Sequence, residues 1–368
     1  MKSNLTDKIF FYCLPQGTPD KAAYQHGIVC LGEGLKSLGI EFHSNINYWK
    51  ISPEKEEYLF CQDSQVTPDD CSVVVLNDLW FRYGQPFPEN LFHSKRKYIT
   101  VYLELWKESN FALKPEFRKF DLVLKAQCNR SLKYPSNCHP WTFGLSSRIL
   151  KETDILPNFK ERKQHLLVNF RVDHSVRQVV GEKFLPRIQS VLPIDNSSDS
   201  FDAPPASSYD YLQWSQTGRR HYPNYYKRLR ESAACACFGG VLQPSWTKDP
   251  AAPAKLWHRI LSKLDLRPTQ LVKWESWRFW EALAAGCVPF HLDYEKYGAD
   301  LPVMPNNWQH YVGIDLDNIQ ESIDRIADDP ELLERISTEG RLWALQYYSP
   351  VPTAERFMEI IRTQIAKR

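Results

Sequence analysis

Short apolar runs alternate with longer segments of helical periodicity along the chain. In the first half the apolar runs are KIFFYCL (8–14), CSVVVLND (71–78), KYITVYLEL (97–105) and FDLVLKA (120–126). After the first run, residues 21–39 carry apolar side chains at helical spacing and end at a glycine. Strands that are apolar at every position are typical of a parallel sheet with helices on both faces. The first half therefore predicts a parallel α/β unit.

The same alternation starts again after a segment rich in Pro, Gly and charge, near residues 145–163, where we place the link between two domains. The further elements that the pattern predicts are the strands 164–170, 287–292 and 311–316, the helices 175–191, 276–285, 318–329, 330–348 and 352–368, and a helix running into a strand over 224–240. Residues 197–208 (SSDSFDAPPASS) are typical of a surface loop. Because 368 residues exceed what one ordinary core serves, two α/β domains are favoured over one large sheet.

Composition and charge restrict the partners. The 46 basic and 44 acidic side chains give a net charge of +2, which offers no argument for nucleic acid or an anionic membrane as the main partner. We therefore expect no nucleic-acid partner. No stretch of about 18 apolar residues occurs, so we expect no transmembrane segment, and peripheral membrane contact stays open. The nine cysteines form neither a CxxC pair nor a zinc-site spacing, which favours reduced core thiols and a cytoplasmic protein.

Residues 271–290 (LVKWESWRFWEALAAGCVPF) combine charge and aromatic bulk just before a strand. We expect Ser276 to cap a helix that ends at Gly286. On that helix Glu275, Arg278 and Glu281 recur every three residues and would share one side, while the tryptophans at 277 and 280 pack inward.

The N-terminal end of this helix has the chemistry of a diphosphate site. Free backbone N–H groups, the helix dipole and the cations Lys273 and Arg278 would surround a diphosphate beside Ser276. One or two turns later, Glu281 would accept hydrogen bonds from vicinal hydroxyls such as those of a ribose. Together these features describe a nucleotide-sugar site. The residues alone leave the alternative open of a surface helix with a salt bridge over a tryptophan-rich buried face.

The block SWRFWEALAAGCVPF, followed by an Asp and by Leu-Pro, resembles the C-terminal motif of exostosin-like and related glycosyltransferases of the GT-B fold. HLLVNFRVDHSVR, YYKRLRESAACACFGG and the helices after residue 307 are similar, in the same order, to further parts of a GT-B donor domain. The resemblance covers residues 165–365 by motif and 1–150 by the alternation of strands and helices alone. It implies two Rossmann-like domains with a cleft between them: an acceptor domain over 1–155, a donor domain over 156–345, and a C-terminal helix over 346–368 that crosses back to the first domain.

The resemblance also implies roles for single residues. Glu281 matches the glutamate that holds the ribose, and Ser276 with Arg278 matches the Ser-x-Arg beside the donor diphosphate. The other donor-binding residues that we expect are Arg171, His174, Arg177, Trp246, Lys273 and Asp293. Residues 238–246 would form the nucleobase shelf with Trp246 stacking on the base, although a plain turn after a strand explains them as well. One position departs from the wider GT-B pattern: Lys273 stands where a second glutamate is expected, which favours the exostosin-like branch and leaves inversion or retention open.

An inverting transferase needs a base on the first-domain wall of the cleft. Asp78 and Glu104 end apolar strands, and polar residues at the carboxyl ends of parallel strands face the crevice. His26 has the better intrinsic pKa, and Asp20 lies in the same loop. We therefore predict His26, Asp78 and Glu104 as catalytic candidates without choosing among them.

The resemblance implies no cofactor and no metal, because GT-B enzymes hold the leaving diphosphate with cations and a helix dipole. The acidic run Asp315–Asp317 precedes a helix, where Asp317 would cap the helix rather than bind a metal. The leading hypothesis is a glycosyltransferase that moves a sugar from a nucleotide-diphosphate donor to a hydroxyl of a glycan, peptide or small-molecule acceptor. The alternatives are a nucleotide-sugar epimerase or hydrolase of the same fold, a non-catalytic nucleotide-sugar or glycan-binding protein, and an unrelated two-domain α/β binding protein.

Overall fold

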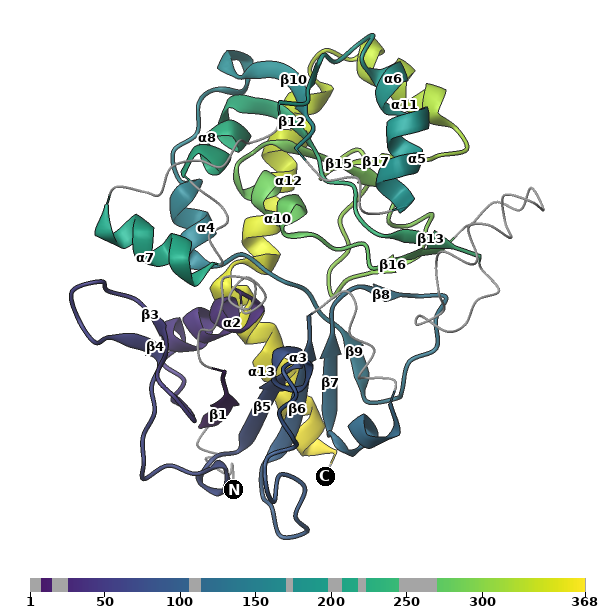
Figure 1. Ribbon diagram of the computed structural model, residues 1–368. Helices are drawn as coiled ribbons and strands as arrows, with labels where there is room; N and C mark the ends of the chain where they lie inside the picture. Colours follow the sequence, from purple (N-terminus) through teal and green to yellow (C-terminus); the bar gives the residue numbers. More distant parts are fainter. Residues whose placement is uncertain are drawn as a thin grey trace.

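The structure is a computed structural model that describes residues 8–14, 26–105, 114–169, 175–197, 207–217, 223–244 and 270–367, except for the side chains of His26 and Pro223. Two parallel sheets dominate it, one in the lower and one in the upper half of Figure 1. All nine cysteines are free, and seven of them are buried, as the sequence predicted.

The first sheet has six parallel strands in the order β2-β1-β5-β6-β7-β9. Their bounds are Phe42–Ser44 (β2), Ile9–Tyr12 (β1), Val73–Asn77 (β5), Ile99–Glu104 (β6), Leu122–Lys125 (β7) and Cys138–Pro140 (β9). The central strands β5, β6 and β7 are buried at every position, as their continuous apolar sequences require. We call this sheet, with α2 (His26–Ser37), α3 (Asp78–Arg82) and α13 (Pro350–Ala366), the first lobe.

The second sheet has five parallel strands in the order β11-β10-β12-β15-β17. Their bounds are Ile194–Asp195 (β11), Lys163–Leu167 (β10), Ser232–Ala236 (β12), Val288–Leu292 (β15) and Val312–Ile314 (β17). Its helices are α4 (Ser147–Glu152), α5 (Ser175–Lys183), α6 (Leu185–Ile188), α7 (Ser208–Gln216), α8 (Pro223–Glu231), α10 (Trp277–Ala284), α11 (Ile319–Asp328) and α12 (Leu332–Tyr348). We call this sheet and these helices the second lobe.

Smaller elements complete the chain. Three antiparallel pairs are β3 (Tyr48–Lys50) with β4 (Tyr58–Phe60), β13 (Val241–Gln243) with β14 (Gln270–Val272), and β8 (Cys128–Asn129) with β16 (Ala299–Asp300). Short 3₁₀ turns span Pro68–Asp70 (η2), Pro115–Lys119 (η4) and Phe159–Glu161 (η5). The pair β8–β16 joins the two lobes, because β8 lies between β7 and β9 of the first sheet and β16 follows β15 of the second.

The helix expected over 175–191 is two helices, α5 and α6, with the break at Phe184. Pro186 explains the break, since it has no N–H to donate and its ring clashes with the preceding helical turn. The periodicity of the apolar residues continues across the break, so the sequence pattern alone did not show it. Elements of three residues or fewer, such as β2, β9 and β13, also gave no periodic signal.

The chain crosses between the lobes at two places. Residues 141–146, which we call the connector, lead from β9 to α4 and are buried throughout. At the other end of the chain, α13 lies against α2 (Figure 1). Gly34 permits this close approach, because a Cβ there would lie 1.9 Å from the Pro350 carbonyl oxygen. The predicted domain bounds of 1–155, 156–345 and 346–368 stay a prediction.

Candidate functional site

The order of strands in the second sheet marks a place for a ligand. The chain passes from β10 to β11 on one side and then to β12 on the other, so the connections diverge between β10 and β12. In open parallel sheets, ligands bind outside the carboxyl ends of the strands at such a point. Asn169 follows β10 there, and Phe238 follows β12.

Two arginines stand at this point. Arg278 Nη2 donates to the Asn169 carbonyl oxygen at 3.1 Å, and Arg177 Nε donates to the Phe238 carbonyl oxygen at 2.8 Å. Arg278 comes from the first turn of α10, while Arg177 comes from α5. Both guanidinium groups are charged at any physiological pH. The structure therefore brings together two of the cations that the sequence assigned to a diphosphate, although nothing tests that role.

The N-terminal end of α10 keeps unused hydrogen-bonding capacity. Ser276 is the N-cap, as predicted, but its side chain makes no capping bond. Its Oγ is buried without a hydrogen-bond partner, and so is Arg278 Nε. Just before the helix, Lys273 is partly buried and has a φ of 56°, a left-handed conformation that costs free energy in a residue other than glycine. Gly286 ends the helix at a φ of 58°, also as predicted.

The turn after β12 needs its two glycines. A Cβ on Gly239 would lie 2.7 Å from the Trp274 carbonyl oxygen, and a Cβ on Gly240 would lie 2.7 Å from that of Val272. His291 Nε2 lies 3.1 Å from the Gly239 nitrogen, and burial lowers the pKa of this histidine to about 3, so the ring is neutral. The turn then continues as β13, paired with β14. The nucleobase-shelf role of 238–246 stays a prediction, and Trp246 lies outside the described residues.

Glu281 lies inside the second lobe with both oxygens occupied. It is 1% exposed, and it accepts hydrogen bonds from the Tyr225 hydroxyl at 2.6 Å and the Tyr226 hydroxyl at 3.2 Å. Burial raises its pKa to about 7, against the opposing effects of the Tyr225 bond and the charge of Arg278. To hold a ribose, Glu281 would exchange one tyrosine for a sugar hydroxyl. Its ribose role stays a prediction, and the sequence gave no sign of the tyrosine pair.

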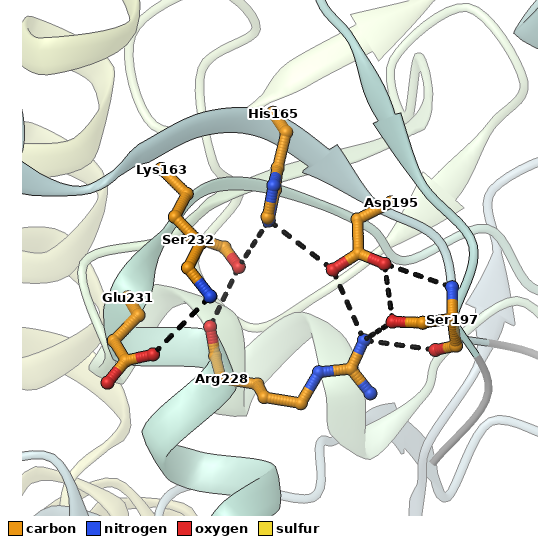
Figure 2. A network of polar contacts seen from close by, with 7 residues as sticks. All are labelled: Lys163, His165, Asp195, Ser197, Arg228, Glu231 and Ser232. Carbon is orange, nitrogen blue, oxygen red and sulfur yellow. Dashed lines mark hydrogen bonds and ion pairs between the residues drawn. The ribbon is translucent and has the colours of Figure 1, made fainter.

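A polar network anchors the helix that carries these tyrosines (Figure 2). Arg228, in the last turn of α8, donates to the Ser197 carbonyl oxygen at 3.0 Å and lies 3.4 Å from Asp195. Ser232, which follows α8, donates to the Arg228 carbonyl oxygen at 2.7 Å and bonds His165 of β10 at 2.9 Å. The network therefore ties α8 to β10 and β11. His165, Arg228 and Ser232 lie in two blocks that the sequence analysis named, but the contacts between these blocks join segments distant in the sequence, which no motif showed.

Glu275 departs from the expected arrangement. The spacing of three residues predicted that Glu275, Arg278 and Glu281 share one side of a helix. Glu275 instead precedes the N-cap and turns to the connector, where it bonds Thr142 at 2.6 Å. The periodicity fails here because a residue outside the helix does not follow its 100° step per residue.

The catalytic candidates of the first lobe lie at the carboxyl end of its sheet. Glu104 ends β6 and is fully buried, and it forms an ion pair with Lys125, which ends β7. Burial is the largest single effect on the pKa of Lys125 and lowers it, yet the charge and hydrogen bond of Glu104, together with the nearby cysteines, outweigh burial and the pKa lies above its usual value. A carboxylate held this way is not free to accept a proton without breaking a buried pair, which favours a structural role for Glu104.

Asp78 follows β5 and is 1% exposed. It lies beside Glu104, because β5 and β6 pair with Asn77 opposite Leu103, and both carboxylates raise the pKa of Tyr102 after the larger effect of burial. His26 is the first residue of α2, and its side chain lies outside the described part of the chain. Asp20, Arg171 and His174 lie outside it as well. The choice of a base among His26, Asp78 and Glu104 is therefore untested.

Two further acidic positions have local structural partners. Asp293 accepts hydrogen bonds from the backbone N–H groups of Glu295 at 2.9 Å and Lys296 at 3.1 Å, and so holds the turn after β15. The expected cap of α11 by Asp317 is wrong, because the N-cap is Asn318. Asp317 instead forms an ion pair with Lys296, with 3.0 Å between Asp317 Oδ2 and Lys296 Nζ. Lys296 also pairs with Asp315. The lysine is distant in the sequence, which hid the pairing.

Comparison with solved structures identifies the fold. An alpha-glucosyltransferase in complex with UDP and a 13-mer DNA containing a HMU base shares 10% sequence identity, over 96% of this chain and 99% of that chain, with a TM-score of 0.51. AviGT4, a glycosyltransferase involved in Avilamycin A biosynthesis, shares 12% identity over 98% of both chains, with a TM-score of 0.52. The fold is GT-B. The predicted fold class is thus confirmed, and at these identities the likeness shows the fold alone.

The sequence comparisons add nothing further. No protein-family model matches the chain, and no curated protein matches it. Among the helices of the described ranges, none combines the length and the apolar character that crossing a membrane demands.

Proposed function

We propose that the chain is a glycosyltransferase that moves a sugar from a nucleotide-diphosphate donor to a hydroxyl of an acceptor. The observation that carries this proposal is the place of Arg278 and the N-terminal end of α10 at the carboxyl edge of the second sheet, in a fold that AviGT4 and the alpha-glucosyltransferase share along nearly their whole length. Both of those proteins are described as glycosyltransferases. Fold alone does not set function, so the proposal depends on this site.

The donor's diphosphate would lie at the N-terminal end of α10. The helix dipole, the buried Ser276 Oγ and the charge of Arg278 all favour an anion there. Arg177 and Lys273 would add positive charge from either side. With these groups neutralising the leaving diphosphate, the proposed transfer needs no metal ion and no cofactor. UDP is the first nucleotide to test, because the alpha-glucosyltransferase was solved with it.

The acceptor would lie against the first lobe. Asp78 is the first candidate to test as the base, because Glu104 is already paired with Lys125. We propose a glycan, a peptide or a small molecule as the acceptor. The DNA in the similar structure belongs to that protein, and the near balance of 46 basic and 44 acidic side chains gives no reason to extend it to this chain. We further place the protein in the exostosin-like branch on the strength of the block around 276–289, and in the cytoplasm on that of its free cysteines.

Calorimetric titration with UDP, GDP, ADP and TDP tests the donor site. One diphosphate should bind, and Arg278→Ala should weaken it about 10- to 100-fold, the value of a hydrogen bond to a charged group. Arg187→Ala, an exposed arginine on α6 of the same lobe, is the matched control and should leave binding unchanged. Binding of none of the four, or equal effects of the two substitutions, would contradict the proposed site.

Product analysis separates transfer from the alternatives. A transferase should consume the donor sugar faster when a pool of glycan, peptide or small-molecule acceptors is added, and a new glycoside should form. An epimerase or hydrolase would consume the donor equally without acceptor, and a binding protein would not consume it. A parallel assay with duplex DNA tests nucleic acid as an acceptor. Transfer of the sugar to DNA would overturn the proposed acceptor classes.

A further inference from the structure

One buried carboxylate joins the connector to α10. Glu275 lies one residue before the N-cap of α10 and is 5% exposed. Its Oε1 accepts hydrogen bonds from Thr142 Oγ1 at 2.6 Å, from the Phe143 N–H at 3.0 Å and from Trp280 Nε1 at 2.8 Å. The first two donors belong to the connector and the third belongs to α10. A single oxygen atom therefore holds both segments.

The surroundings of Glu275 strengthen this junction. The Phe143 ring stacks on Trp277 of α10, with centroids 4.6 Å apart and an angle of 20° between the rings. The N–H of Gln127 also faces the carboxylate, and Gln127 has a φ of 62°, a conformation that residues other than glycine adopt only where the surroundings hold it. Gln127 follows β7 of the first sheet and precedes β8. Three separate segments thus converge on Glu275.

The junction lies directly beside the proposed diphosphate site. Ser276 and Arg278, the groups that would bind the donor, are one and three residues further along the same backbone. We propose that Glu275 is a positioning residue that fixes the N-terminal end of α10 against the connector, and thereby holds these two groups at the place where the donor's diphosphate binds. The effect on the donor rests on the proposed function, whereas the junction itself can be tested without it.

The chemistry of the junction indicates which substitution preserves it. All three hydrogen bonds end on Oε1, so the carbonyl oxygen of a glutamine can accept them in the same position. Burial, the largest effect, raises the pKa of Glu275 to about 7. In the described part of the chain, the titratable groups that face Glu275 include Tyr294 and Tyr348. Both tyrosines are neutral near pH 7, because burial raises their pKa above the usual value. The other oxygen, Oε2, is buried without a hydrogen-bond partner, so the amide nitrogen of a glutamine in its place breaks no hydrogen bond, whereas an alanine leaves three buried donors without an acceptor.

The experiment compares Glu275→Ala with Glu275→Gln. For each folded variant, calorimetry measures UDP affinity, and hydrogen exchange measures protection of residues 141–146 and 276–280. Glu275→Ala should bind UDP at least about ten-fold more weakly, as loss of hydrogen bonds to a charged group implies, and both segments should exchange faster. Glu275→Gln should restore affinity and protection to within about three-fold of the wild type.

Glu33 supplies a matched control. It accepts a hydrogen bond from the Ser147 N–H at 2.7 Å, just after the connector, and burial raises its pKa to about 7 as well. It lies on α2 of the first lobe, whereas α10 belongs to the second. Glu33→Ala should therefore leave UDP affinity and the exchange of 276–280 unchanged. If Glu275→Ala does not fold, Thr142→Val removes one of the three donors and should give the same changes at smaller size.

The outcomes separate this proposal from the proposed function. Wild-type protein that binds none of UDP, GDP, ADP and TDP would overturn the donor site, and the exchange data would still decide the junction. Unchanged exchange in Glu275→Ala would overturn the junction itself. Weak binding by Glu275→Gln equal to that of the alanine variant would show that the three hydrogen bonds to Oε1 do not account for the effect of residue 275 on the donor, and would overturn the positioning role.

Discussion

The carboxyl ends of the two sheets carry their charges in opposite ways. In the first lobe, Lys125 and Glu104 face each other in a buried ion pair and neutralise one another. In the second lobe, Arg278 and Arg177 donate to backbone carbonyl oxygens, which leaves their net charge uncancelled by those bonds. The first arrangement joins two neighbouring strands, and the second is the place where we propose that an anion binds. The difference teaches that the charges at such an edge can come from the strand ends themselves, as with Glu104 and Lys125, or from helices that pack beside it, as with Arg278 of α10 and Arg177 of α5.

Breaking the first pair should have the largest effect on stability. Lys125→Met leaves the Glu104 charge buried without its partner, and we expect the free energy of unfolding to fall by about 3–5 kcal/mol. Urea denaturation measures it. Replacing both residues, with Glu104→Leu and Lys125→Met, should recover most of the loss because no charge remains buried. A loss below about 1 kcal/mol in the single variant would show that water reaches the pair.

The second prediction concerns the pH dependence of stability that the buried Glu281 of the second lobe causes. Burial raises the pKa of Glu281 from 4.5 to about 7, so the folded state binds its proton more tightly than the unfolded state does. The resulting stabilisation is complete below pH 4.5 and is lost as the pH rises through about 7, by up to about 3 kcal/mol.

Glu281→Gln should remove this group's share of the decline between pH 4.5 and pH 8. Urea denaturation of both proteins at several pH values checks the difference between the two slopes. A variant with the wild-type slope would mean that Glu281 titrates at its ordinary pKa in the folded protein.

The glycine turn beside the arginines gives a smaller effect. Gly240 has a φ of 95°, and a Cβ there would lie 2.7 Å from the Val272 carbonyl oxygen. Gly240→Ala should cost at least about 2–3 kcal/mol, because both the conformation and the contact are unfavourable. Gly39 has a φ of 69° with open space around it, so Gly39→Ala should cost only about 1–2 kcal/mol. Thermal melting measures the loss of stability in each variant. Equal losses in the two variants would show that the close contact at Gly240 does not add to the cost of the substitution.

Much of the fold could be predicted because its signals are local. The apolar runs that became β5, β6, β7 and β15 are buried at every position, as their nearly continuous apolar sequences predicted. A strand with one face in water would instead alternate polar and apolar residues. The helix α10 begins after Ser276 and ends before Gly286, where its capping residues placed it. Short strands such as β2 and β9 escaped prediction, because their pairing with a neighbour, and not their own three residues, makes them strands.

For the candidate site, the sequence proposed members but gave no sign of their hydrogen-bond and ion-pair partners. The sequence singled out Ser276, Arg278 and Glu281 from their spacing and chemistry. It gave no sign that Tyr225 and Tyr226 occupy both oxygens of Glu281, or that Glu104 is paired with Lys125. These partners are separated by 21 to 56 residues, and spacing along a helix or strand says nothing over such lengths.

The sequence by itself determined the alternation of strands and helices, the burial of the central strands and the two ends of α10, because each follows from the residues within a few positions. Only the tertiary structure decided which partners surround each charge. It turned Glu275 away from Arg278 and toward the connector, and it set Arg278 against a backbone carbonyl. The physical reason is that the environment of a buried charge is built by segments distant in the chain, and burial and pairing, not residue type, fix what the charge can do.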